Sequence, residues 1–388
     1  MKLLTISRTP LLHHGDNAIA KIGSILSSHQ GNALLVTGGR SYESLNAHKH
    51  ILAECTRLKI DISHCRISRE PSPSMIDKAV QDFGNNQPKV VIGLGGGSVI
   101  DAAKAIAAMI PIREPVKEYL EGVGTRNHPG IRLPLIALPT TSGTGSEATR
   151  NAVLSEVGPS GFKRSLRHMN FVPDVAILDP SLTISCPPEV TAYSGMDAFT
   201  QLLESYLSTA SNSITDALAI HGLQLVAQSL VTAYRDGSNV QARSDMALAA
   251  YLSGVTLANA GLGTVHGLAG VIGGMKDIPH GIICSRLMGP ANVVTVRKLR
   301  SKRVSEVALS KYAQAGRVVT GHASSSDDYC IDALLDFINH LTASLNIPSL
   351  KEYGVTENDL REFARLGDNK NNPAALNEEE RFEVLTAG

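Results

Sequence analysis

The sequence contains no tryptophan, and aromatic residues make up only 4% of its 388 residues. Proteins that bind single-stranded nucleic acids usually stack bases on aromatic side chains, so this mode of recognition is disfavoured. The chain also lacks net charge, because 36 basic residues balance 36 acidic ones. Nucleic-acid-binding proteins usually carry a net positive field. We therefore expect no nucleic-acid partner.

The chain also lacks the features of secreted and membrane proteins. Its five cysteines are scattered without C-x-x-C spacing, as is typical of reduced thiols in a cytoplasmic protein. The N-terminal residues do not contain the apolar run of a signal peptide. A helix that spans a membrane needs about 18 consecutive apolar residues, and the sequence contains no such stretch. The sequence thus predicts a cytoplasmic protein with no membrane partner.

Hydrophobic periodicity divides the chain into two halves. In the first half, short apolar runs alternate with helical patterns, which predicts a mainly parallel sheet covered by helices. Strands are expected at residues 32–37, 61–67, 89–94 and 135–138, and helices at 40–58, 74–83 and 98–109. The second half has helical spacing almost throughout. Its expected helices are 188–207, 213–235, 240–260, 265–273, 303–320, 326–345 and 357–366. We therefore expect an α/β domain over residues 1–182 and an all-α domain over residues 183–388.

A glycine-rich segment, Gly95–Ser98, follows one of these strands and begins a helix. Glycines let a ligand approach the backbone, and the free N–H groups of a helix N-terminus attract anions. The segment therefore predicts a site for the pyrophosphate of a dinucleotide. Because Ser98 takes the place of the last glycine in G-x-G-x-x-G, a plain strand–helix turn stays an alternative.

A second polar loop, PTTSGTGSE at residues 139–147, follows the next strand. Its hydroxyl groups and bare N–H groups suit contacts with ribose, amide and phosphate. The alternative is a helix N-terminus with a capping box formed by Thr144 and Glu147. Arg150 and Asn151 follow the loop and are candidates for pocket residues. A pocket-facing Arg150 would favour an anionic substrate, whereas a surface arginine is the alternative.

Asp197, His266 and His280 offer one carboxylate and two imidazoles, a donor set that suits Zn²⁺ or Fe²⁺. Three protein ligands plus an open position are typical of a catalytic metal site. Gln201 lies one helical turn after Asp197 and shares its face. Since histidines beside glycine are often ordinary packed residues, the spacing alone leaves that alternative open.

Taken together, these segments resemble the iron-containing (group III) alcohol dehydrogenases. GGGSVIDAAK at residues 95–104 and PTTSGTGSE are similar to the cofactor motifs of that family. GMDAFTQLLESY at residues 195–206, GLGTVHGLAG at 261–270 and IPHG at 278–281 are similar to its metal-binding segments. The resemblance covers nearly the whole chain. It implies a dehydroquinate synthase-like architecture, with a dinucleotide-binding α/β domain, an all-α domain and an active site between them.

The resemblance further implies a metal-dependent NAD(P)-linked alcohol dehydrogenase or aldehyde reductase that binds Fe²⁺ or Zn²⁺. In such an enzyme a hydride moves between the nicotinamide and an alcohol or carbonyl substrate held at the metal. A homodimer is also implied. The implied metal-binding residues are Asp197, Gln201, His266 and His280, of which Asp197, His266 and His280 are also the catalytic ones. The implied cofactor-binding residues are Gly38, Gly39, Arg40, Ser41, Gly95, Gly96, Gly97, Ser98, Asp101, Thr140, Thr141, Thr144, Lys163 and Leu182.

Three positions depart from patterns common in this family. Gln201 stands where a histidine is usual, and a neutral amide oxygen is a weaker donor, so we expect an unusual metal site. Gly270 stands where many relatives have a histidine that helps to relay protons, which widens the pocket. Gly38 stands where NAD-preferring relatives often have an aspartate, and Arg40 follows it, so NADP(H) is favoured over NAD(H).

Two other functions stay open at this stage. A dehydroquinate synthase-like cyclase would use NAD and a metal only transiently, but the PTTSGTGSE motif favours the dehydrogenase. A non-catalytic nucleotide-binding protein with a degenerate metal site is compatible with Gln201 and Gly270.

Overall fold

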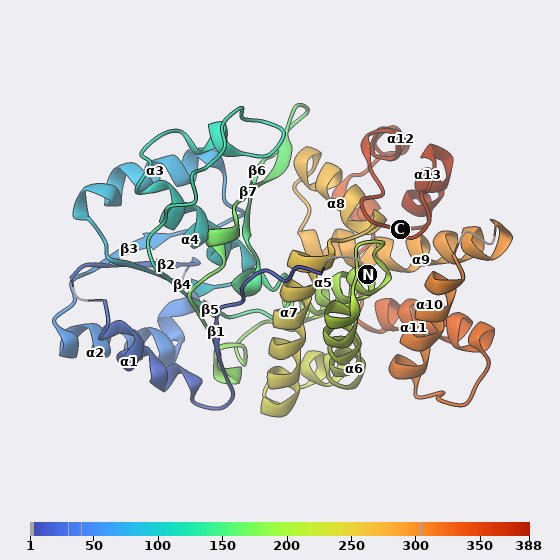
Figure 1. Ribbon diagram of the computed structural model, residues 1–388, viewed down its shortest axis with the longest axis horizontal. Helices are drawn as coiled ribbons and strands as arrows, with labels where there is room; N and C mark the ends of the chain where they lie inside the picture. Colours follow the sequence, from blue (N-terminus) through green and yellow to red (C-terminus); the bar gives the residue numbers. More distant parts are fainter. Residues whose placement is uncertain (1–3, 30, 40, 303–304) are drawn as a thin grey trace.

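The computed structural model describes residues 4–29, 31–39, 41–302 and 305–388. An α/β part and an all-helical part lie side by side (Figure 1). The last strand of the sheet, β8 (Val175–Leu178), precedes the first long helix, α5 (Pro188–Leu207). The predicted fold class is confirmed: a mainly parallel sheet with helices, followed by an all-α region.

Six parallel strands form the main sheet in the order β1-β8-β5-β4-β2-β3. The remaining strands of this sheet are β1 (Leu11–His14), β2 (Ala33–Thr37), β3 (Ile62–Arg66), β4 (Val90–Gly95) and β5 (Leu135–Pro139). β2, β4 and β5 are buried along their whole length. Such strands are apolar on both faces because helices cover both sides of the sheet.

Four helices and a hairpin cover this sheet. They are α1 (Ile22–Leu26), α2 (Asn46–Leu58), α3 (Pro73–Phe83), α4 (Gly97–Met109) and the antiparallel pair β6 (Asn151–Glu156) and β7 (Phe162–Arg167). α3, α4 and the hairpin share one hydrophobic cluster, and α1 and α2 share another. The helix expected from residue 40 begins only at Asn46, after a 3-10 turn over Ser41–Ser44.

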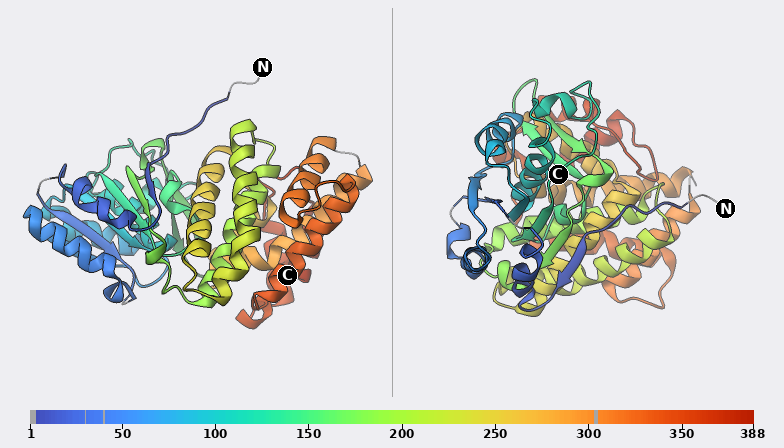
Figure 2. Two further views of the ribbon diagram at one scale, coloured as in Figure 1. Left: turned by 90° about the horizontal axis from the view of Figure 1, so that it is seen from below. Right: turned by 60° about the vertical axis from the view of Figure 1, so that its left-hand side comes forward.

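The helical part continues from α5 with eight further helices among the described residues. They are α6 (Ser213–Arg235), α7 (Val240–Ala260), α8 (Thr264–Met275), α9 (His280–Lys302), α10 (Glu306–Thr320), α11 (Asp327–Ser344), α12 (Glu357–Leu366) and α13 (Glu378–Ala387). α6 packs beside α7, and α10 packs beside α11 (Figure 2). One hydrophobic cluster joins these helices and includes Ala176 and Leu178 of β8.

By length and composition alone, α6 is apolar enough to cross a membrane, as is the bent pair α7 and α8 if taken as one span. One face of α6 packs against α5 and α7, where Ala219, Leu223 and Leu230 are buried, and 39% of its apolar stretch is buried in total. This packing accounts for the apolar residues of that face.

Candidate metal centre and cofactor cleft

The glycine loop lies where the strand order of the sheet reverses. β3 and β4 are consecutive in the chain but lie on opposite sides of β2. In doubly wound folds, ligands bind at the carboxyl ends of the strands at such a point. Gly38 and Gly39 follow β2 there, and the glycine loop follows β4. Because Gly96 precedes α4 without a side chain, the first N–H groups of this helix stay open to a phosphate.

The two polar loops pack directly on each other. A Cβ atom at position 97 would lie 2.5 Å from Thr144 Oγ1, so Gly97 is the residue that allows this approach. The backbone N–H of Thr140 also donates to Gly95 O at 3.0 Å. A Cβ atom at position 96 would lie 3.3 Å from Thr141 Oγ1. The loops therefore form one continuous wall of the cleft.

The capping-box interpretation of Thr144 and Glu147 is wrong. Gly145, with φ of 58°, precedes a 3-10 turn of only three residues, Ser146–Ala148. Thr144 Oγ1 accepts a hydrogen bond from the N–H of Ser146 at 3.3 Å instead. The second loop is thus a compact turn, and its hydroxyl groups stay near the glycine loop.

Asp101, on α4, lies in a buried polar cluster that lines the cleft. It accepts hydrogen bonds from the Ser146 hydroxyl and from the Val153 N–H, and Lys104 Nζ lies 3.1 Å from its Oδ1. Burial lowers the pKa of Lys104 although Asp101 opposes this effect. Burial also raises the pKa of Glu147 to about 7. The protein itself thus satisfies the Asp101 carboxylate, which fixes α4 to the second loop.

The other residues expected at the cofactor lie in different settings. Lys163 Nζ pairs with Glu70 at 2.6 Å and lines the cleft beside His280. Leu182 is buried in the core that α1 and α2 share with the sheet. Ser41 begins the 3-10 turn that follows β2. Arg40 lies outside the described residues.

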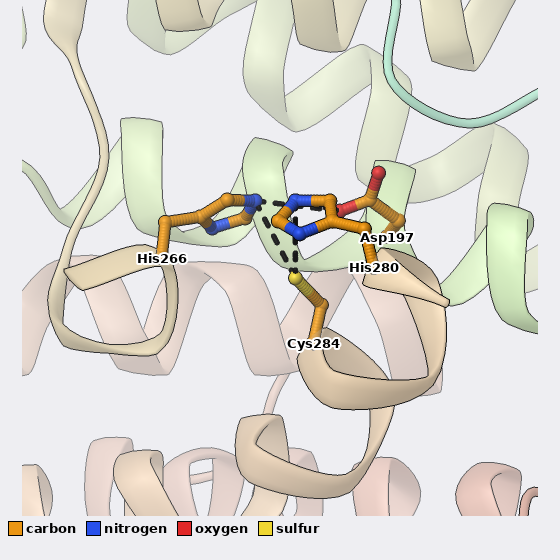
Figure 3. A group of neighbouring side chains, drawn as sticks. All are labelled: Asp197, His266, His280 and Cys284. Carbon is orange, nitrogen blue, oxygen red and sulfur yellow. Dashed lines mark hydrogen bonds and ion pairs between the residues drawn. The ribbon is translucent and has the colours of Figure 1, made fainter. Parts of the chain in front are cut away.

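Asp197, His266 and His280 point toward one another from α5, α8 and α9 (Figure 3). Asp197 Oδ1 lies 3.3 Å from His266 Nε2 and 3.8 Å from His280 Nε2. His266 Nδ1 lies 2.6 Å from Glu204 Oε2, one of the carboxylate contacts that often orient metal-binding histidines. Sequence spacing could not establish this convergence, which depends on how three helices pack.

The cluster also contains Cys284, which the sequence did not single out. Its Sγ lies 3.6 Å from Nε2 of both histidines, and the four possible ligand atoms lie within 4.8 Å of one another. The available signal was the His280-x-x-x-Cys284 spacing, which places both residues on one face if a helix runs through them.

These residues fit a divalent metal ion. Asp197 is 1% exposed, and its Oδ1 has no hydrogen-bond partner among the described residues. A buried carboxylate oxygen is costly unless a partner compensates it, and a cation supplies that partner. A carboxylate, two imidazoles and a thiol are all donors that Zn²⁺ accepts.

The charge states of the cluster also suit a metal ion. Burial opposes the ionisation of Asp197, yet the two imidazoles lower its pKa to about 2. Burial and the Lys163 ammonium lower the pKa of His280 to about 4, which keeps its imidazole neutral. For His266, burial is outweighed by Cys284 and Glu204, which raise its pKa well above the usual value. A bound metal ion would displace the proton that the His266 imidazole holds between the carboxylates of Asp197 and Glu204.

Two of the three positions that depart from the family pattern, Gln201 and Gly270, lie at the same cavity. Gln201 Nε2 donates to Asp197 Oδ2 at 3.2 Å, and its Oε1 accepts from Ser253 Oγ at 3.2 Å. Gly270 lines the cavity, and a Cβ atom there would meet no described atom within 4 Å. The absent side chain therefore leaves open space, as expected.

One cavity of about 210 Å³ connects the glycine loop with the metal cluster. Gly97, Ser98 and Thr144 line one end, and His266 and His280 line the other. Asn151 lines it as expected, but Arg150 does not belong to its lining. Arg150 Nη1 contacts Met169 Sδ at 2.8 Å instead. The arginine that lines the cavity is Arg167, which the sequence did not indicate.

Comparison with known proteins identifies the family. Residues 10–180 match the family model for iron-containing alcohol dehydrogenase, and residues 191–387 match the C-terminal model of the same family. The chain is 34% identical over 362 residues to alcohol dehydrogenase 4 of Saccharomyces cerevisiae, covering 92% of this chain and 89% of the relative. It is 29% identical over 386 residues to the NADPH-dependent butanol dehydrogenase of Clostridium saccharobutylicum, covering 96% and 95%.

Solved structures agree with this assignment. The structure of a 1,3-propanediol oxidoreductase superposes with a TM-score of 0.88 at 28% identity, covering 100% of both chains. The structure of an alcohol dehydrogenase from Oenococcus oeni also gives a TM-score of 0.88, at 26% identity and 99% coverage of both chains. The chain belongs to the iron-containing alcohol dehydrogenase family and is an alcohol oxidoreductase.

Proposed function

We propose that this protein interconverts small primary alcohols and their aldehydes with NADP(H) as the hydride carrier and a divalent metal ion as the Lewis acid. The observation that carries the proposal is the single cavity that joins an open helix N-terminus to a buried Asp–His–His cluster. A dinucleotide with its pyrophosphate at Gly97 and Ser98 would direct its nicotinamide along this cavity. A dehydroquinate synthase-like cyclase is disfavoured by the relatives, which are named alcohol dehydrogenases.

Each group of residues has a distinct task in this proposal. A metal ion held here would supply Lewis-acid polarisation of the substrate oxygen, and a bound nicotinamide would supply or accept the hydride. The N–H groups at the start of α4 hold the pyrophosphate, and Thr141 and Thr144 orient the nicotinamide half. Asp197, His266 and His280 hold the metal, while Leu257 and Leu262 give the cavity an apolar wall that limits water. With glycine at position 270, the protein provides room there in place of a proton-relaying side chain.

A panel of linear aldehydes with NADPH, before and after chelation of metal, tests this function. We expect turnover that chelation abolishes and that added Zn²⁺ or Fe²⁺ restores. The variant His280→Ala should lose turnover, whereas the surface variant Glu383→Gln should keep it. Full activity in the chelated protein and in His280→Ala would overturn the metal-dependent mechanism.

The preference for NADP(H) rests on Gly38, at the end of β2. A Cβ atom at this position would lie 3.8 Å from Val99 Cγ2, so a larger side chain fits without displacing the backbone. An aspartate there would accept the ribose 2′-hydroxyl of NADH and repel the 2′-phosphate of NADPH. The variant Gly38→Asp should therefore raise the ratio of kcat/KM for NADH over NADPH by at least about 10-fold, or roughly 1.4 kcal/mol. An unchanged ratio would contradict the preference.

We also infer two domains, residues 1–182 for the dinucleotide and residues 183–388 for the metal, in a homodimer. The change from strands to long helices between β8 and α5 supports the boundary. Sedimentation analysis of the purified protein tests the dimer, and a monomer at all concentrations would contradict it.

A further inference from the structure

Cys284 offers a fourth donor atom to the metal cluster. It follows His280 by one turn of α9, so the two side chains project from the same face of the helix. The thiol is 0% exposed, and its Sγ lies 3.6 Å from Nε2 of both His266 and His280 (Figure 3). Neither imidazole nitrogen needs such a neighbour for packing. A shared cation explains why three donors converge on the same point.

The spacing of the donor atoms is close to that of a tetrahedral site. An ion with bonds of about 2.0 Å to nitrogen or oxygen and about 2.3 Å to sulfur places two nitrogen or oxygen donors roughly 3.3 Å apart and a nitrogen and a sulfur roughly 3.5 Å apart. Four of the six separations are 3.3 and 3.8 Å from Asp197 Oδ1 to the two histidines and 3.6 Å from Cys284 Sγ to each of them. All six lie within 4.8 Å, so the four atoms can close around one ion.

Gln201 is already engaged elsewhere. Gln201 Nε2 donates to Asp197 Oδ2 at 3.2 Å, so the NH₂ group of Gln201 faces the carboxylate. The amide oxygen, which is the only metal-binding atom of this side chain, therefore points to Ser253 Oγ. Gln201 thus orients Asp197 so that Oδ1, which lacks a hydrogen-bond partner among the described residues, faces the two histidines.

We propose that Cys284, in place of Gln201, is the fourth protein ligand, and that Asp197, His266, His280 and Cys284 together bind Zn²⁺ in preference to Fe²⁺. This inference rests on the proposed metal-dependent function and specifies its ligands and its ion. On binding, the Cys284 thiol releases its proton to solvent and its thiolate forms the bond to zinc. A thiolate with two imidazoles suits the borderline-soft Zn²⁺. His266 and His280 line the cavity and Asp197 and Cys284 do not, so a substrate oxygen would enter as a fifth ligand from the histidine side.

Cobalt spectroscopy of the full-length protein tests the thiolate ligand without any measurement of activity. The protein is stripped of metal and titrated with Co²⁺, which reports a bound thiolate through a near-ultraviolet charge-transfer absorption. We expect this absorption in the wild type and in Gln201→Ala, and its loss in Cys284→Ala. The matched control is Cys330→Ala, which removes a thiol equally buried on α11 and should keep the absorption.

Metal competition measures the second part of the proposal. Cys284→Ala should bind Zn²⁺ more than about 100-fold more weakly than the wild type, beyond the effect of an outer hydrogen-bond partner. Added Zn²⁺ should displace Fe²⁺ from the wild type at equal concentration, and retention of Fe²⁺ would overturn the choice of ion.

Uptake of Co²⁺ by the wild type without the charge-transfer absorption would overturn Cys284 as a ligand and leave the proposed function standing. Failure to bind Co²⁺, Zn²⁺ or Fe²⁺ would overturn both. If Cys284→Ala does not fold, the wild-type spectrum still decides.

Discussion

Glu204 does not reach the centre of the cluster, but it holds one of the residues that do. Its Oε2 contacts His266 Nδ1 at 2.6 Å, and its Oε1 accepts from the N–H of Val265 at 2.7 Å. The carboxylate thereby fixes the ring so that Nε2 faces Asp197. A histidine held in this way is a better donor, because the tautomer and the ring orientation are set before the metal arrives.

Replacing Glu204 with glutamine should therefore weaken metal binding by about 10- to 100-fold while the fold stays intact. The amide keeps an oxygen for the Val265 N–H but loses the negative charge beside His266. Competition with a chromophoric chelator measures the affinity. The control is Glu383→Gln on α13, which removes an exposed ion pair with Arg297 of α9. This variant should bind metal like the wild type. Equal affinities in the two variants would contradict the orienting role.

Glu147 is a buried carboxyl group whose pKa is raised by burial from 4.5 to about 7. Below pH 4.5 the group is protonated in both the folded and the unfolded chain and costs nothing. As the pH rises toward 7, the unfolded chain ionises first, so the free energy of unfolding falls by up to about 3 kcal/mol. The variant Glu147→Gln cannot ionise and should lose this decline. Denaturant unfolding of both proteins across this pH window measures the difference, since all other titrating groups are shared. Parallel pH profiles would show that Glu147 ionises normally.

At the scale of elements, the sequence predicted best where burial is uniform. The strand and helix around the glycine loop were predicted within one residue at either end, because β4 is apolar on both faces and α4 begins at a glycine. The ends of α5, α6, α7 and α12 were also as expected. These helices have several turns of regular spacing and clear breaks between them.

The elements that the sequence did not reveal are those with mixed patterns. β7 has the sequence FKRSLR, in which apolar and polar residues alternate little. α9 contains Gly281, Gly289 and Pro290, which are unfavourable in a helix. β1, β6, β8, α1 and α13 were missed as well.

Because α9 was not predicted, the sequence did not indicate that His280 and Cys284 lie on the same face of a helix. Of the four donor residues that the structure brings together, the sequence singled out Asp197, His266 and His280, and it proposed Gln201 in place of Cys284.

The second loop and α7 touch through their backbones, and this contact joins the α/β part to the helical part. A Cβ atom on Gly254 would lie 2.1 Å from Gly145 O, and one on Gly145 would lie 2.2 Å from Ala250 O. Backbone atoms at such distances cannot move aside as a side-chain tip does. The variant Gly254→Ala should therefore lower the free energy of unfolding by about 1–3 kcal/mol. It should also raise KM for the cofactor, because the loop that carries Thr144 is displaced.

Gly270→Ala is the matched control, since it also lies inside a helix but faces open space. Alanine is favoured over glycine in a helix interior by up to about 1 kcal/mol, so this variant should be as stable as the wild type or more stable. Denaturant unfolding compares the two variants directly. Equal destabilisation by both would mean that the close contact with Gly145 is not what requires glycine at position 254.

At the scale of the whole molecule, the metal cluster ties together helices that are distant in the chain. Asp197 belongs to α5, His266 to α8, and His280 and Cys284 to α9, so an ion bound there would link three segments of the helical part. Without the ion, the buried Asp197 carboxylate has the imidazoles of His266 and His280 as neighbours, at 3.3 and 3.8 Å. An ion that binds the folded chain and not the unfolded one stabilises it by mass action.

The thermal midpoint should therefore rise with the concentration of free metal. Above the dissociation constant, each tenfold increase in free Zn²⁺ adds about 1.4 kcal/mol to the free energy of unfolding. Calorimetry of the chelated protein at graded concentrations of Zn²⁺ measures this slope. Asp197→Ala removes the carboxylate that lies beside both histidines, so its thermal midpoint should not change with Zn²⁺. The thermal midpoint of Glu383→Gln should rise as that of the wild type does. A wild-type midpoint that does not change with metal would mean that the ion contributes nothing to the packing of these helices.

Because this stabilisation acts through α5, α8 and α9, loss of metal should first loosen the helical part and leave the sheet with its glycine loop folded. Hydrogen exchange of the chelated protein should then show faster exchange in these helices than in β2, β4 and β5.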